Sequence, residues 1–88
     1  MYSYSVTVHK KPATESDEPI SFDFTSHDEL AGILARAKSK VFLPGEEATA
    51  FAVGLKIFAS VMIEHRKEEP FAEFAEHFGA FMRKLKSM

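Results

Sequence analysis

The sequence predicts an α+β fold in which an antiparallel two-stranded β-hairpin is followed by three α-helices. Apolar and polar residues alternate strictly over residues 2–9 and again over 20–25, which is typical of half-buried strands. Three later segments, at about 27–39, 46–67 and 70–86, repeat apolar residues with the period of a helix. Because the chain has 88 residues and no long linker, we expect a single domain over 1–88.

The predicted hairpin covers about residues 2–25. Residues 10–19 hold no large apolar side chain and therefore predict a loop between the two strands. Strands that follow one another across a loop usually pair antiparallel. One face of the hairpin is apolar and is expected to lie on helices; it comprises Tyr2, Tyr4, Val6, Val8, Ile20, Phe22 and Phe24.

The first helix is predicted to start after Ser26. Ser26 and Glu29 have the spacing of a capping box, in which each side chain accepts a hydrogen bond from a free backbone N–H group. Leu30, Ile33 and Leu34 then begin an apolar face at helical spacing.

The second helix is predicted to be central and buried because it is apolar on two faces. Its broad face holds Ala48, Phe51, Ala52, Leu55, Phe58, Ala59, Met62 and Ile63. On the opposite side lies a second stripe that consists of Ala50, Val53, Ile57 and Val61. A helix with two apolar faces needs to be covered from two sides.

The third helix starts at Pro70, a residue that suits the first helical position. Its apolar face is rich in phenylalanine and comprises Phe71, Phe74, Phe78, Phe81, Met82 and Leu85. We interpret this face as part of the core; the alternative is a ligand pocket lined by phenylalanine.

Composition limits the classes of function. The chain has no cysteine, which favours a reducing, cytoplasmic location, and residues 2–9 show no apolar signal segment. The apolar run at 48–63 is shorter than the ~20 residues that a membrane span needs. A net charge of −2 makes nucleic-acid binding less favoured. Such binding would need basic residues to converge in space, namely Lys10, Lys11, Arg36, Lys38, Arg83, Lys84 and Lys86.

Several segments resemble a known family. They are Tyr2-x-Tyr4-x-Val6-Thr7-Val8, the run at 47–56, Glu69-Pro70-Phe71-Ala72-Glu73-Phe74 and Phe78-Gly79-Ala80-Phe81-Met82. They are similar to segments of a family of small, mostly bacterial proteins catalogued as a domain of unknown function. The resemblance spans nearly the whole chain. It implies a compact, cytoplasmic bacterial protein and brings no activity and no catalytic residues.

No pattern of catalytic, cofactor-binding or metal-binding residues emerges, so we expect a protein that is not an enzyme. Glu73 and His77 stand at i, i+4 on one helix face and are the best candidates for polar contacts to a ligand. Two ligands from one helix are too few for a tight metal site, which needs three or four. We therefore predict no metal and no cofactor.

The leading hypothesis is an interaction or binding module that acts as a homodimer. The candidate interface is the second stripe together with the connector before it: Ala50, Val53, Ile57, Val61, Phe42 and Leu43. The hairpin edges offer another way to pair two chains, and the sequence leaves both open. The alternative functions are a small-molecule or metal-binding accessory protein with a phenylalanine-lined pocket, and thirdly a nucleic-acid-binding protein.

Overall fold

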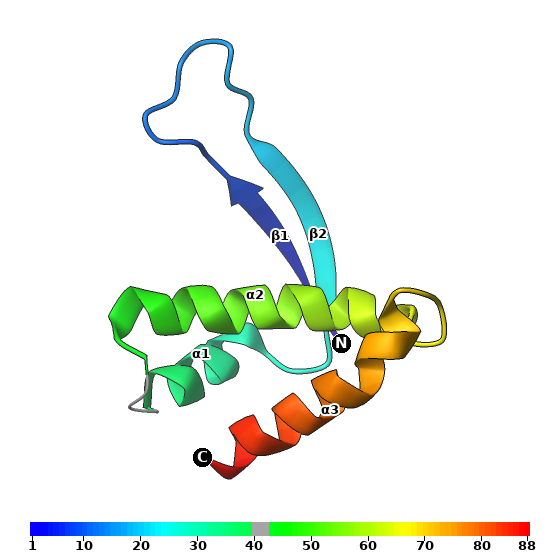
Figure 1. Cartoon of the computed structure of the whole chain (residues 1–88). Helices are drawn as coiled ribbons and strands as arrows, with labels where there is room; N and C mark the ends of the chain where they lie inside the picture. The colour runs from blue at the N-terminus through cyan, green and yellow to red at the C-terminus, as the bar shows by residue number, and fades with distance from the viewer. Residues whose placement is uncertain (40–42) are drawn as a thin grey trace.

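A computed structural model describes residues 1–39 and 43–88 and confirms a hairpin followed by three helices (Figure 1). The elements in chain order are β1 (Tyr2–Val8), β2 (Ile20–Ser26), α1 (Leu30–Ser39), α2 (Gly45–Glu64) and α3 (Phe71–Ser87).

The register of the hairpin follows the alternation of the sequence. Tyr4 pairs with Phe24 across the two antiparallel strands, and their rings stack with centroids 5.5 Å apart. On the polar face, the Ser5 hydroxyl donates a 2.7 Å hydrogen bond to the carboxylate of the opposite residue, Asp23. Each face of the hairpin is therefore held by cross-strand pairs of its own chemistry.

Helix α1 begins at Leu30, three residues later than predicted. The Ser26 hydroxyl accepts a 3.2 Å hydrogen bond from the N–H group of Asp28, which lies before the helix, so the predicted capping box with Glu29 is wrong. The N–H group of Leu30 instead donates a 2.7 Å hydrogen bond to the hydroxyl of Tyr4 on β1. The hairpin thus supplies the acceptor that a cap residue would otherwise provide.

Helix α2 ends at Glu64, three residues before the predicted end at residue 67. The N–H group of His65 still donates to the carbonyl of Val61, but the following residues form turns. The His65 ring lies 2.8 Å from the Glu68 carboxylate, measured from Nδ1 to Oε2. Proline disfavours helical geometry in the residue before it, so Pro70 separates the two helices and α3 starts at Phe71.

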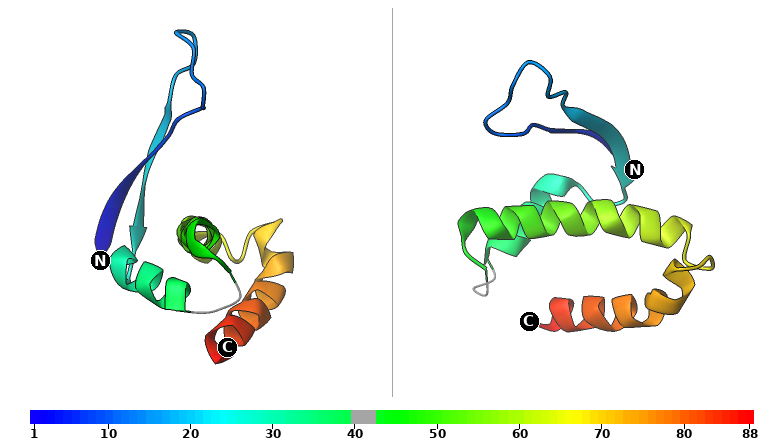
Figure 2. Two further views of the ribbon diagram at one scale, coloured as in Figure 1. Left: turned by 90° about the vertical axis from the view of Figure 1, so that its left-hand side faces the viewer. Right: turned by 45° about the horizontal axis from the view of Figure 1, so that its top comes forward.

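The helices leave much of α2 uncovered. Figure 2 shows α2 in the centre, with the hairpin and α1 on one side and α3 on the other. Among the described residues, the buried apolar side chains are Phe24, Ala48, Ala52 and Met62. Burial of α2 is therefore confined to its broad face, and the expectation of a helix buried on both sides is wrong for the isolated chain. Within residues 1–39 and 43–88, no helix is long and apolar enough to cross a membrane.

Candidate interaction surface

The second stripe of α2 lies on the side that no other element fully covers. Ala50 is exposed, Val53 and Ile57 are half-buried, and Val61 is exposed. At 100° per residue these side chains, together with Gly54, lie on one side of the helix. The structure therefore places the stripe where a second chain could reach it.

Leu43, the described connector residue of the candidate interface, does not join this stripe. Leu43 lines a cavity of about 210 Å³ between the three helices, beside Ala48, Phe51 and Met82. Helices α1 and α2 pack against each other on the two sides of this cavity. Phe42 lies outside the described residues.

A groove lined by phenylalanine runs between α2 and α3, next to the second stripe. We call it the Phe groove; it is lined by Ala50, Phe51, Gly54, Leu55, Phe58, Phe74, His77, Phe78 and Phe81. The ring of Phe58 meets Phe74 and Phe78 edge-on, with centroids 6.2 and 5.6 Å apart. These edge contacts join the two helices, because aromatic pairs favour this geometry.

The Phe groove is only partly filled by its own side chains. Phe58, Phe74 and Phe81 remain 40%, 44% and 45% exposed. The interpretation of the third helix as simple core is thus too strong, since two of its phenylalanines are almost half in water.

The two candidate polar residues separate in the structure. His77 lines the Phe groove, whereas Glu73 is exposed and does not line it. Within the described part of the chain, no three histidine, aspartate or glutamate side chains come close enough to hold a metal ion. Among the described residues that line the groove, His77 alone has a polar side chain, so a bound small molecule would find few groups to fix its orientation.

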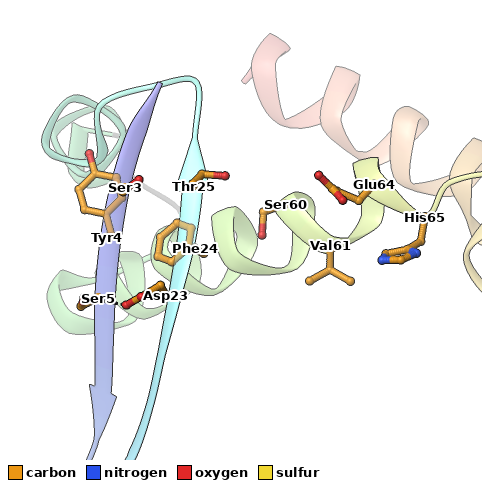
Figure 3. Close-up of a pocket in the computed structure, with 10 residues that line it drawn as sticks. All are labelled: Ser3, Tyr4, Ser5, Asp23, Phe24, Thr25, Ser60, Val61, Glu64 and His65. Atoms are coloured by element: carbon orange, nitrogen blue, oxygen red, sulfur yellow. Dashed lines mark hydrogen bonds between the residues drawn. The ribbon is translucent and has the colours of Figure 1, made fainter.

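A second hollow, of about 470 Å³, opens between the hairpin and the end of α2 (Figure 3). Its lining residues are Ser3, Tyr4, Ser5, Asp23, Phe24, Thr25, Ser60, Val61, Glu64 and His65. The hollow is polar at its rim, where Glu64 and His65 lie, and Val61 from the second stripe reaches it. No sequence pattern indicates this hollow, because it arises from the packing of residues far apart in the chain.

Charged side chains line the cavity between the three helices and not the second stripe of α2. The Lys56 ammonium lies 3.0 Å from the Asp28 carboxylate. The hydrogen bond from Lys56 and the positive charge of Lys56 lower the pKa of Asp28 below the ordinary value of 3.8. Arg36 and Lys86 line the same cavity, but Lys10 lies on the loop at the far end of the hairpin (Figure 1). The basic residues named for nucleic-acid binding therefore do not converge as one set.

The isolated chain has an unusually large surface. Its solvent-accessible area is 6987 Å². A compact monomer of 9.9 kDa is expected to expose about 5,200 Å², so the excess is about 1,800 Å². The radius of gyration, 15.1 Å, also exceeds the roughly 12 Å expected for this length. The fold is open because the hairpin and α3 diverge from α2.

Comparisons with known proteins agree on the fold and give no activity. The sequence profile of DUF3861, described as a domain of unknown function with a solved structure, matches residues 2–87. A crystal structure of a protein of unknown function from Pectobacterium atrosepticum is similar, with a TM-score of 0.89 and 39% sequence identity. The match covers 99% of this chain and 98% of that chain. A search of curated proteins finds no match.

Proposed function

Since the chain belongs to DUF3861, a family whose function is unknown, we propose from its geometry that it is an interaction module that acts as a homodimer. In this proposal the protein works by binding and not by catalysis. Its lack of cysteine fits work in a reducing cytoplasm.

The observation that carries this proposal is the excess of exposed surface. Obligate homodimer interfaces bury 2,000 Å² or more in total, which is about 1,000 Å² from each partner. The excess of about 1,800 Å² on this chain is large enough to supply such an interface. A second copy that buried about 1,000 Å² of each chain would remove more than half of this excess.

The chemistry of the exposed surface supports the same function. The exposed side chains include Phe58, Val61, Phe74 and Phe81, which border the second stripe and the Phe groove. Monomeric soluble proteins rarely expose a continuous apolar patch of more than a few hundred Å². A partner that covers this side would remove an aggregation hazard and add the apolar burial that the thin core lacks.

The small-molecule alternative rests on the Phe groove, whose volume is about 600 Å³. Ligand pockets enclose most of their ligand and place a few polar groups around it. The groove is open and offers only the imidazole of His77, so it suits an apolar surface better than a small polar compound. The metal and nucleic-acid alternatives have weaker support, because the described ligands and cations are dispersed.

Native mass spectrometry of the untagged protein separates these functions. We expect a species of twice 9.9 kDa. A 9.9 kDa chain that carries an additional small mass would favour the ligand alternative, and a bare 9.9 kDa chain at every micromolar concentration would contradict the homodimer.

A further inference from the structure

Gly54 lies in the middle of α2, and no contact within the chain's own fold requires a glycine there. Apart from proline, glycine is the poorest helix former, so a helix interior normally holds another residue. The sequence suggests that a neighbouring helix approaches Gly54 closely. The structure contradicts this for the chain's own helices, because a Cβ atom added at Gly54 would meet nothing within 4 Å.

The position of Gly54 shows what its missing side chain creates. It lines the Phe groove, one helical turn after Ala50 and one turn before Phe58. The two small residues form a notch in the surface of α2. Beside this notch stand the half-exposed rings of Phe58 and Phe74. A notch and a ridge therefore lie next to each other on one face.

The face of α2 around the notch can be buried without burying charge. Between residues 50 and 61 the one charged residue is Lys56. Its ammonium group is turned toward the segment before α1, where it lies 3.0 Å from the Asp28 carboxylate. Two identical copies of this face could thus meet with no repulsion between like charges.

We infer that the notch at Gly54 is the contact point for α2 of a second copy of this chain. This inference rests on the proposed homodimer and specifies its interface. The two α2 helices cross at Gly54 about a two-fold axis, and the phenylalanine ridge of each copy packs on the second stripe of the other. A two-fold interface requires a surface that complements itself, and a notch beside a ridge meets this requirement.

The area of surface supports a second copy as the occupant. The whole chain exposes about 1,800 Å² more than a compact monomer of its mass, which exceeds the area of about 1,000 Å² that each partner buries in an obligate homodimer. An interface of this size could cover the second stripe of α2 together with the exposed phenylalanines of the Phe groove, which runs next to that stripe.

The first test compares Gly54→Leu with Gly32→Leu. Both glycines lie in helices, and an added Cβ would meet nothing within 4 Å at either position, so both variants are expected to fold. Leucine at 54 fills the notch and should raise the dimer dissociation constant at least tenfold. Leucine at 32, on α1, should leave it unchanged. Light scattering gives the mass, and circular dichroism confirms that each variant is folded.

A second test uses the absence of cysteine from the sequence. A disulfide needs two Cα atoms within about 4.4–6.8 Å, a separation that two helices crossing at a glycine can reach. Under mild oxidation, Gly54→Cys should form a covalent dimer in high yield, whereas Gly32→Cys should not. This test does not depend on whether leucine disturbs the fold.

The outcomes distinguish the interface from the dimer itself. If the wild-type protein is a dimer but Gly54→Leu dissociates no more than Gly32→Leu and Gly54→Cys does not cross-link, the inferred interface is wrong and the homodimer stands. A dimer that forms by pairing of the hairpin edges would give this pattern. If the wild-type protein is a monomer, the proposed function and this inference are both wrong.

Discussion

The hydrogen bond from Leu30 to Tyr4 predicts the effect of removing a single oxygen atom. Tyr4→Phe keeps the ring that stacks on Phe24 and deletes the hydroxyl that accepts the N–H group of Leu30 at 2.7 Å. A net hydrogen bond contributes about 0.5–1.5 kcal/mol to stability, and loss of a helix cap costs about 1 kcal/mol. We therefore expect a loss of about 1 kcal/mol in the free energy of unfolding.

For a domain of this length, a loss of about 1 kcal/mol lowers the Tm by about 4–8 °C. Thermal unfolding followed by circular dichroism measures this shift. Protein concentration has to be held constant, because association with a partner makes the Tm depend on concentration. The matched control is Tyr2→Phe, which makes the same chemical change at an exposed position on the same strand. Equal Tm values for the two variants would refute the assignment of Tyr4 as the cap of α1.

Two further predictions concern the core and the charges. Met62→Ala should cost about 2–5 kcal/mol because Met62 is 2% exposed, whereas Ile63→Ala, at a position 58% exposed, should cost less than about 1 kcal/mol in the same denaturant titration. Equal losses would show that the buried face of α2 is wrongly assigned. Lys56 lowers the pKa of Asp28 in the folded state, so their ion pair stabilises the fold above pH 3.8 and is lost as the pH falls through the lowered value. The stability difference between wild type and Asp28→Asn, measured by urea unfolding, should therefore be present near neutral pH and vanish at acidic pH; a difference that grows on acidification would contradict this sign.

The parts of the fold that the sequence predicts well are those set by local patterns. The alternation over residues 2–9 determined the faces of the hairpin, and the register confirms them, with Val6 opposite Phe22. The expectation that the apolar face lies on helices is wrong over much of its length, because Val8 and Ile20 are 50% and 64% exposed. The helical period placed all three helices. The start of α1 was wrong because its acceptor, the Tyr4 hydroxyl, comes from a strand 26 residues away in the chain. The motif of Ser26 and Glu29 predicts a local cap, whereas the observed cap is a tertiary contact that no local sequence pattern reveals.

The candidate interface was predictable only where a local sequence pattern determines it. The second stripe is a periodic pattern, so it could be recognised on the helix, and the structure places it on the uncovered side of α2. The Phe groove and the hairpin hollow depend on how far α3 and the hairpin diverge from α2, which periodicity does not encode. Glycine is unusual in the interior of a helix, but only the structure shows that the chain's own fold leaves the space beside Gly54 empty.

Sedimentation equilibrium of the untagged protein across the micromolar range tests most directly whether the chain forms a homodimer. The large exposed area of the isolated chain predicts a species of twice 9.9 kDa that dissociates only on strong dilution. A single species of 9.9 kDa at every concentration would contradict the account, because the apolar surface on α2 and α3 would then remain in water.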